Sequence, residues 1–418
     1  MKCMFPSGAI KQHALDLGFD LVGVGPPSAV QDLAFLRQWV KNGHGGEMRY
    51  LADPRREDLR RVMPSVQSVI CVGLIYNTEF PYSTDAGSHN QQEGKLTGRR
   101  ASPREPGSRA WISRYAWGSD YHNVMRGKLE KLRIAIESLA QGVETRVYVD
   151  TGPIVERAFA RLSGIGWMGK NTCLINERKG SWFFLGVVLT SLELEFDLPA
   201  PDRCGSCTRC LEACPTGALV QPYVMDASRC IAYLNIELKG AIPEEFRAAM
   251  GSNVFGCDIC QDVCPWNNRP SPAREDMLRD DAAPGGRQCT EPQQRHTAAT
   301  RLAEFQPMQI AINASEQGTE RARGNQPVPP SPSEAEFSLC HPAIQDLALI
   351  SEEGFRLLFA RSPIKRAKYR GWFRNLCVAM GNSGDRQFIP WLESAADYPD
   401  PIVREHAGWA LRKLQGGP

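Results

Sequence analysis

The sequence lacks a long hydrophobic run, and this absence bears on where the protein works. The most apolar stretch, from Trp182 to Leu192, is far too short to span a bilayer. The N-terminal residues Met1 to Ser7 show no apolar core of signal-peptide length and no small-residue cleavage pattern. We therefore expect a cytoplasmic protein that makes no contact with membranes.

The sequence also lacks a net charge of either sign. Its 49 Lys and Arg residues nearly balance its 47 Asp and Glu residues, which leaves a formal charge of +2. A strongly basic chain, the usual electrostatic sign of a nucleic-acid-binding protein, is therefore excluded. Any basic surface for a nucleic acid must be local.

Two common nucleotide-binding motifs are missing as well. The glycine-rich segment 164–172 is neither a GxGxxG fingerprint nor a Walker A loop. Its glycines let the backbone approach a large flat ligand closely. Upstream, Asp150 follows a predicted strand and begins the motif DTGP. An Asp at a strand end of an α/β sheet lies where ligand crevices form. An N-cap role at the start of the next helix is an equal alternative for this residue.

The alternation of helical and strand patterns predicts an α/β domain over residues 1–195. At roughly 100–200 residues per domain, 418 residues suggest two to four domains. The pattern favours a sheet covered by helices on both faces. The expected strands are 21–24, 66–76, 143–149 and 183–192, and the expected helices are 30–42 and 121–140.

Two segments interrupt these patterns. Residues 77–110 are rich in Ser, Gly, Pro, Gln and charge and show no periodicity, so we expect an inserted surface loop. A longer break at about 268–337 has the proline and charge content of a linker or insertion. We place this linker at 269–340, with a short helix near 301–305.

Residues 341–418 are expected to form a helical domain. Apolar residues at helical spacing predict four successive amphipathic helices at 342–360, 365–380, 385–396 and 401–414. The segment 388–392 can pack against Val403, Ala407, Ala410 and Leu411 of the last helix. Such a pair resembles one unit of a HEAT-like repeat. An ordinary small helical bundle is the alternative.

The fourteen cysteines supply the most specific pattern in the sequence. In a reducing cytoplasm they are expected to be thiols or metal ligands rather than disulfides. One run has the spacing C-x2-C-x2-C-x3-C-P of bacterial ferredoxins, and a second run reads C-x2-C-x3-C-P. Structural zinc sites usually pair two CxxC units across a loop, so zinc is the weaker alternative. The remaining cysteines fit no ligand spacing and are expected to be buried free thiols; they are Cys3, Cys71, Cys173, Cys289, Cys340 and Cys377.

Eight of these cysteines make two sets of four, and each [4Fe–4S] cluster needs four thiolates. The fourth cysteine of a ferredoxin run ligates the other cluster, which brings the two clusters close together. We therefore predict a ferredoxin-like two-cluster domain at 196–268, with an insertion at 233–253. One ligand set is Cys204, Cys207, Cys210 and Cys264, and the other is Cys214, Cys230, Cys257 and Cys260.

Long segments of the chain resemble epoxyqueuosine reductases. The matching segments are VQSVICVGLIY (66–76), ISRYAWGSDYH (112–122), VDTGPIVERA (149–158), GIGWMGKNT (164–172), GSWFFLG (180–186), CGSCTRCLEACPTGAL (204–219), RCIAYLNIELKGAIPEEFR (229–247) and GCDICQDVCPWN (256–267). The resemblance covers most of residues 8–268 and the C-terminal helices at 341–415.

The resemblance implies a fold, a reaction and partners. The α/β domain would bind a base-off cobalamin between itself and the cluster domain, and the clusters would reduce its cobalt. The reduced cobalt would remove oxygen from epoxyqueuosine at position 34 of a tRNA with a GUN anticodon, forming queuosine. The chain would act as a monomer with an electron donor that the sequence does not identify.

The resemblance also implies roles for individual residues. Asp150 matches the family's proton donor, and a carboxylic acid with a raised pKa can protonate the alkoxide that forms as an epoxide opens. Closure of the site by a corrin and a nucleobase would desolvate Asp150 and so raise its pKa. His122, in the DYH motif, is expected to be a hydrogen-bonded structural residue rather than a cobalt ligand. The implied cobalamin contacts are Arg56, Ser113, Asp150, Leu174, Leu185 and Ser228, with a plain surface charge as the alternative for Arg56.

A basic stretch in the C-terminal helices is the candidate RNA-binding surface. Its cations are Arg361, Lys365, Arg366, Lys368, Arg370 and Arg374, and the interleaved aromatic residues are Tyr369, Trp372 and Phe373. Cations can follow phosphates, and exposed aromatic rings can stack on unpaired bases. Helical spacing would place Lys365, Lys368 and Trp372 on one face. Lys239 is a further candidate by the resemblance, and a solvated charged helix is the alternative for the stretch.

Two other functions remain open at this point. One is a corrinoid iron–sulfur reductase of a small molecule, similar to a dehalogenase, which would not need the basic C-terminal helix. The other is a ferredoxin-type electron-transfer protein, which would need neither Asp150 nor the glycine-rich segment.

Overall fold

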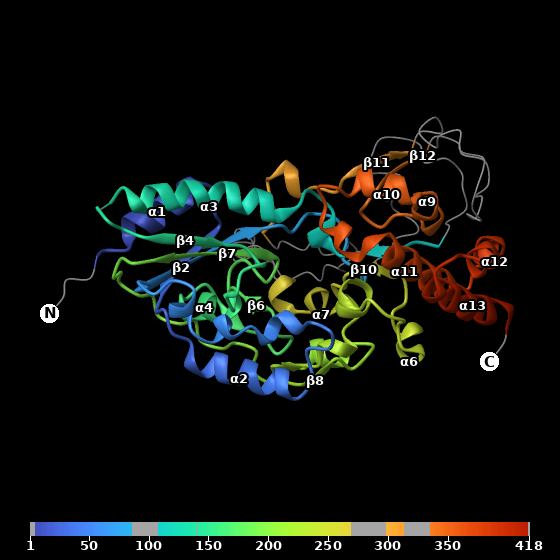
Figure 1. Ribbon diagram of the computed structural model, residues 1–418, viewed down its shortest axis with the longest axis horizontal. Helices are drawn as coiled ribbons and strands as arrows, with labels where there is room; N and C mark the ends of the chain where they lie inside the picture. Colours follow the sequence, from blue (N-terminus) through green and yellow to red (C-terminus); the bar gives the residue numbers. More distant parts are fainter. Residues whose placement is uncertain (1–4, 86–107, 140, 269–297, 313–334, 417–418) are drawn as a thin grey trace, which may run out of the picture.

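The computed structural model describes residues 5–85, 108–139, 141–268, 298–312 and 335–416 (Figure 1). Most of the two predicted insertions, at 77–110 and 268–337, lies outside these ranges. In the predicted helix near 301–305, a 3-10 turn forms at Ala303–Phe305. No helix within the described ranges has the length and apolar character that a membrane crossing requires.

A four-stranded sheet forms the centre of the N-terminal part. Its strands lie in the order β1-β2-β7-β4, and every neighbouring pair is antiparallel. The continuous apolar runs of the two central strands are typical of strands buried on both faces, and every residue of β2 is buried. The strands are β1 (Leu21–Gly25), β2 (Ser68–Ile75), β4 (Thr145–Tyr148) and β7 (Phe183–Thr190).

Helices cover both faces of this sheet, as the sequence predicted (Figure 1). On one face, α1 (Gly8–Asp16) and α3 (Tyr121–Glu137) pack on alternate residues of β2 and β7. On the other face, α2 (Val30–Lys41) and α4 (Glu156–Leu162) cover the intervening residues. Asp120 caps α3 by accepting a hydrogen bond from the His122 backbone N–H, which places both side chains at the edge of the sheet.

The cysteine-rich segment is built from short elements. They are α5 (Arg209–Glu212), β8 (Leu219–Gln221), β9 (Val224–Met225), a π-helical turn at Tyr233–Glu237, α6 (Glu244–Arg247), β10 (Asn253–Phe255) and α7 (Ile259–Asp262). Strand β10 pairs in parallel with β3 (Trp111–Ile112), so the segment is tied to the chain that leads into α3. A second small pair, β5 (Trp167–Met168) with β6 (Leu174–Ile175), carries the glycine-rich segment.

The C-terminal helices share one apolar core with the cysteine-rich segment. The prediction of a single helix over 342–360 was wrong. Ser351 caps a new helix within this range by accepting a hydrogen bond from the Gly354 backbone N–H. Helices α12 and α13 pack on each other through buried residues that include Leu392 and Val403, and the HEAT-like assignment stays a prediction. The helices are α9 (Ile344–Ala348), α10 (Glu352–Leu358), α11 (Lys368–Ser383), α12 (Ile389–Ala396) and α13 (Pro401–Gln415), preceded by the hairpin β11 (Gln309–Ile312) and β12 (Ala335–Ser338).

The expected face of Lys365, Lys368 and Trp372 does not form. Trp372 is fully buried and Phe373 is nearly so, because α11 packs its aromatic side against the shared core. The lysines stay exposed. Stacking of RNA bases on these two rings is therefore excluded, while the exposed cations remain available.

Arg374, also counted among the RNA-binding cations, is a buried structural residue. Its guanidinium donates hydrogen bonds to the backbone carbonyls of Leu234, Leu238 and Gly240, at distances of 2.6 to 3.0 Å. These carbonyls belong to the π-helical turn and the loop after it. Arg374 therefore connects α11 to the cysteine-rich segment.

Replacing Arg374 by Met should lower the free energy of unfolding by about 3 kcal/mol, because several buried carbonyls would lose their donors. Chemical denaturation followed by circular dichroism would measure this change. Arg370→Met is the matched control: Arg370 is exposed and should contribute less than about 1 kcal/mol. Equal effects of the two substitutions would contradict the structural role of Arg374.

Candidate functional site

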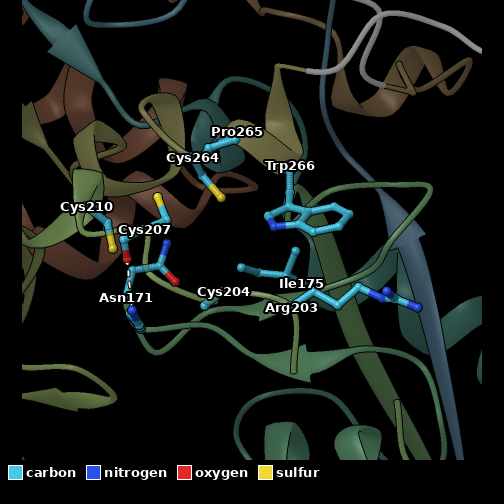
Figure 2. A pocket seen from close by; sticks show the side chains of 10 residues that line it. Asn171, Ile175, Arg203, Cys204, Cys207, Cys210, Cys264, Pro265 and Trp266 are labelled. Atoms are coloured by element: carbon cyan, nitrogen blue, oxygen red, sulfur yellow. Dashed lines mark hydrogen bonds between the residues drawn. The ribbon is translucent and has the colours of Figure 1, made fainter. Parts of the chain in front are cut away.

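Four cysteines from two distant segments surround one cavity of about 240 Å³ (Figure 2). Helices α5 and α7 pack against each other, and this contact brings the first run beside the second. Lys170 donates hydrogen bonds to the backbone carbonyls of Gly205 and Cys207 and so holds the first loop in place. The four cysteines are Cys204, Cys207, Cys210 and Cys264, which is the first predicted ligand set.

The second predicted set also comes together. Burial raises the pKa of Cys257, and the nearby thiols Cys230 and Cys214 raise it further. The pKa of Cys260 is raised as well, and its neighbours include Cys257 and Cys230. Such mutual effects require that these thiols lie near one another. In the described part of the chain, no three His, Cys, Asp or Glu side chains are placed to hold a single metal ion.

Cys173 is a thiol whose location the spacing of the cysteines did not reveal. It is half-buried and shares a hydrogen bond with Cys260. Among the other non-ligand cysteines, Cys71 and Cys377 are buried as expected, whereas Cys340 is only half-buried. The expectation of a buried free thiol was therefore wrong for Cys173 and Cys340, and Cys3 and Cys289 lie outside the described residues.

Asp150 lies just beyond the end of β4, in a left-handed backbone conformation with φ 55°. Asp tolerates this conformation better than most residues. Its backbone N–H donates to Oε1 of Glu156 at 2.7 Å. The N-cap alternative for Asp150 was wrong, because α4 begins only at Glu156 and its N-cap residue is Val155.

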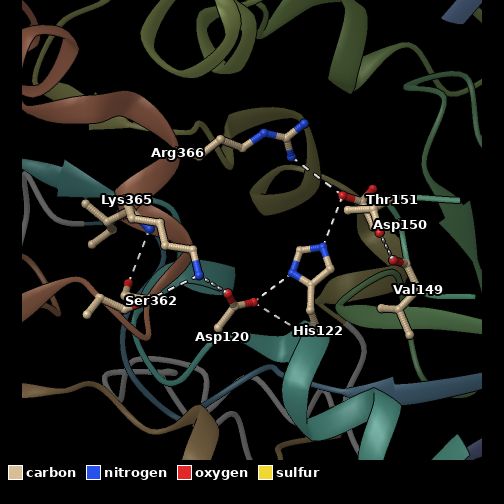
Figure 3. Close-up of polar contacts among 10 residues, drawn as sticks. Asp120, His122, Val149, Asp150, Thr151, Ser362, Lys365 and Arg366 are labelled. Carbon is tan, nitrogen blue, oxygen red and sulfur yellow. Dashed lines mark hydrogen bonds and ion pairs between the residues drawn. The ribbon is translucent and has the colours of Figure 1, made fainter. Parts of the chain in front are cut away.

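The Asp150 carboxylate is one member of a row of alternating charges (Figure 3). Its Oδ2 lies 3.4 Å from Nε2 of His122 and 3.5 Å from a guanidinium nitrogen of Arg366. On the other side, Nδ1 of His122 lies 2.7 Å from Oδ1 of Asp120, and Lys365 pairs with Oδ2 of Asp120 at 2.8 Å. The row joins the α/β part of the chain to the C-terminal helices.

These charges decide the protonation states in the row. Burial raises the pKa of Asp150, but the ion pair with His122 and the Arg366 charge outweigh it, so the pKa is lowered. The expected rise concerned a site closed by a corrin and a nucleobase, and it stays a prediction. For His122, burial alone would lower the pKa, but the hydrogen bond to Asp120 and the ion pair with Asp150 raise it to about 9. At neutral pH the site therefore holds an imidazolium next to a carboxylate.

His122 and Glu156 were not predicted as functional residues. His122 is hydrogen-bonded, as expected, but it also faces Asp150. Burial and the nearby Asp150 charge raise the pKa of Glu156 to about 8. The sequence signals were the DYH and VDTGPIVERA motifs, but a motif alone does not show which side chains face each other.

The predicted cobalamin contacts fall into two groups. Arg56 donates to the carbonyl of Ile154 at 2.9 Å, close to Asp150 in the chain, and Leu174 and Leu185 belong to the apolar cluster that includes Ile154. Ser113 and Ser228 form the second group, whose hydroxyls both bond to residues of the cysteine-rich segment. The buried Ser113 hydroxyl donates to Asp258 at 2.5 Å, and the Ser228 hydroxyl donates to Asp226 at 2.6 Å. These contacts, and that of Asp150, stay predictions.

Two sequence-family models match the chain. Residues 203–267 match a "4Fe-4S double cluster binding domain", and residues 56–151 match "Epoxyqueuosine reductase QueG, DUF1730". Together with the thiol-lined cavity and the imidazolium–carboxylate pair, the first match defines the chain as an iron–sulfur oxidoreductase.

Comparison with known proteins narrows this class to one family. An epoxyqueuosine reductase of Xanthomonas campestris is 35% identical over 410 residues, which cover 96% of this chain and 94% of the relative. An epoxyqueuosine reductase of Escherichia coli is 33% identical over 407 residues, covering 96% and 88%. The chain therefore belongs to the epoxyqueuosine reductase family.

Solved structures agree with this assignment. A crystal structure of an epoxyqueuosine reductase with an epoxyqueuosine-modified tRNA stem loop superposes with a TM-score of 0.73 and 25% identity, covering 98% of this chain and 90% of that one. The structure of the Streptococcus thermophilus epoxyqueuosine reductase superposes with a TM-score of 0.72 and 25% identity, covering 99% and 91%.

The two carboxylates beside His122 generate a prediction about pH. His122 should titrate near pH 9 rather than near its ordinary value of 6.5, and Asp120→Asn should lower its pKa. Imidazole NMR signals followed as a function of pH would measure both. Because the pKa is raised in the folded state, this histidine stabilises the fold fully below about pH 6.5, and the contribution is lost as the pH rises through 9. Titration of His122 at or below 6.5 would contradict the charged row.

Proposed function

We propose that this chain reduces epoxyqueuosine to queuosine in tRNA, using two [4Fe–4S] clusters and cobalamin. The observation that carries the proposal is the proximity of the second set of thiols to a proton-bearing pair, His122 and Asp150. The partly buried Tyr115 is close enough to feel the charges of both Asp150 and Asp258. Since Asp258 lies between Cys257 and Cys260, the pair and the second thiol set are near neighbours.

The residues fit iron–sulfur clusters. Four thiols around a cavity of about 240 Å³ suit a group with several metal atoms, whereas four thiolates on one zinc ion at about 2.3 Å would leave no such space. We assign Cys204, Cys207, Cys210 and Cys264 to one cluster. We assign Cys214, Cys230, Cys257 and Cys260 to the other.

The residues around Asp150 also fit a flat apolar group such as a corrin. Leu185 is the only half-exposed residue of the otherwise buried β7. The pairing of β4 with β7 ends at Tyr148 and Val187, and Asp150 and Leu185 each lie two residues from this last pair, at the same end of the two strands. Leu185, with Leu174 behind it, would bear the corrin, and Arg56 would bind at its edge. When bound, the cobalamin would supply the electrons that removal of the epoxide oxygen requires.

The chain's own residues would supply the proton. At neutral pH, His122 carries the proton and Asp150 is ionised. A nucleobase seated over Asp150 would remove water from the carboxylate, and desolvation favours its neutral form. The proton on Nε2 of His122 can then pass to Oδ2 of Asp150 and on to the oxygen atom that leaves the carbon skeleton.

The exposed cations beside this pair suit an RNA substrate. Arg366, Lys368 and Arg370 are exposed on the C-terminal helices, and Lys239 lies next to them, with its backbone carbonyl bonded to Arg370. Cations in this position can bind the phosphates on either side of the modified nucleotide. A stem loop is the ligand in the related crystal structure, which supports the same class of substrate here.

Asp150→Asn should reduce conversion of epoxyqueuosine tRNA by about 10² to 10⁴-fold, the usual contribution of a positioned acid. Iron content should be retained, and RNA binding should not be weakened. The measurement is anaerobic turnover after reconstitution with iron, sulfide and cobalamin. Asp16→Asn, on the distant helix α1, is the control and should keep wild-type turnover. Wild-type turnover in Asp150→Asn would remove this residue from the chemistry.

Cys264→Ser should lose about four of about eight irons per chain, because one cluster would lose a ligand. Iron and sulfide analysis of anaerobically reconstituted protein would measure this loss, with electron paramagnetic resonance to identify the remaining cluster. Cys377→Ala, at a buried thiol far from the cavity, is the control and should keep the full iron content. Bound zinc in place of iron, or equal iron contents in the two variants, would contradict the two-cluster assignment.

A further inference from the structure

Arg366 extends from the C-terminal part of the chain into the site around Asp150. It belongs to the turn Pro363–Ala367, which precedes α11. One guanidinium nitrogen lies 3.5 Å from Oδ2 of Asp150, and the other lies 2.8 Å from Oε1 of Glu237. Glu237 is mostly buried, with 19% of its side chain exposed, whereas 44% of Arg366 is exposed. The guanidinium thus has one buried anchor and one open side.

The same guanidinium is part of a local concentration of positive charge. Burial lowers the pKa of Lys239, and the charges of Arg366, Arg374 and Lys368 lower it further despite the opposing effect of Glu237. Cations so close together repel one another, and an added anion lowers the electrostatic free energy of the group. An RNA phosphate at this edge would therefore compete with Asp150 for Arg366.

The backbone next to Arg366 is strained. Lys368 ends the turn with φ 59° and ψ 161°, a region that is almost restricted to glycine and costs about 1 to 3 kcal/mol for other residues. Strain of this kind makes an alternative arrangement of the turn less costly. Arg366 is therefore attached to a part of the chain that is suited to movement.

We propose that Arg366 is shared between the acid and the RNA: it binds the Asp150 carboxylate in the free enzyme and transfers to a phosphate of the bound anticodon loop. This inference rests on the proposed function and adds a regulatory step to it. The acid would become available for protonation only when substrate RNA is seated. The C-terminal helices would thereby act on the chemistry as well as on binding.

The direction of the effect follows from the groups that face Asp150. From α3 these are His122 and Tyr121, from the C-terminal turn Arg366, and from α4 Glu156 through the Asp150 backbone N–H. If Arg366 moves to a phosphate, burial still raises the pKa of Asp150, but the Arg366 charge no longer lowers it. The pKa of Asp150 then rises, and the proton of His122 can pass to it.

A double-mutant cycle on RNA binding tests the sharing directly. The probe is an unmodified tRNA anticodon stem loop, with affinity measured by fluorescence anisotropy for wild type, Asp150→Asn, Arg366→Gln and the double variant. Asp150→Asn should tighten binding about tenfold in the wild-type background, because Arg366 then binds a phosphate without first breaking its ion pair with Asp150. In the Arg366→Gln background this gain should fall to about twofold. Equal gains in both backgrounds would overturn the proposal, since simple removal of a negative charge acts alike in each.

Two further variants test whether the coupling belongs to the charge of Arg366. Arg370→Gln, on the same basic edge, should weaken binding but leave the tenfold gain from Asp150→Asn intact. Arg366→Lys, which keeps the charge, should retain most of the coupling. Arg366→Gln should also reduce the slope of log affinity against log salt by about 0.7, the value for one phosphate contact on a single strand. An unchanged slope would show that Arg366 does not bind RNA and would also overturn the proposal.

Turnover separates this inference from the proposed function. Arg366→Gln should raise the KM for epoxyqueuosine tRNA by a larger factor than it lowers kcat. A large fall in kcat with unchanged KM would mean that Arg366 acts only in the chemical step. A wild-type enzyme that does not convert epoxyqueuosine tRNA would contradict the proposed function, whereas the binding cycle uses RNA without the modification and stands independently.

Discussion

The hydrogen bonds that Arg374 and Asn375 donate into the cysteine-rich segment are the interaction on which the arrangement of the site depends. Arg374 satisfies carbonyls of the π-helical turn and the loop after it, and Asn375 bonds to the carbonyls of Asn235 and Val254. A π-helical turn cannot pair all its backbone groups internally, and buried polar groups without partners are costly. Through these bonds α11 fixes Glu237 and the turn that carries Arg366 in relation to Asp150.

The site keeps one proton on His122 beside Asp150, because their mutual charges raise the pKa of the histidine and lower that of the aspartate. His122 is held charged by the carboxylates on either side, and Asp150 is held ionised by the cations on either side. Each charge is partly buried, where such interactions are stronger than in water. The balance is therefore sensitive to any ligand that removes water or draws away a cation. Glu156, which accepts the Asp150 backbone N–H, fixes the position of the acid while these changes occur.

The sequence predicted the features that are local and missed those that depend on packing. Continuous apolar runs located β2 and β7, and cysteine spacing grouped the four thiols that line the cavity. The burial of Trp372 could not be predicted, because helical spacing leaves open which face packs against the cysteine-rich segment. The contact of Arg366 with Asp150 could not be predicted for a related reason: Arg366 lies more than two hundred residues further along the chain.

The contact between α5 and α7 has a consequence for how the protein is made. The cavity borders on three thiols from the first cysteine run and one from the end of the second. In a nascent chain that has left the ribosome with the first run alone, this cavity would lack one wall. The cavity is complete only when Cys264 has been synthesised and α7 has packed against α5. On the proposed ligand assignment, the metal centre would therefore mature only after the whole cysteine-rich segment has emerged.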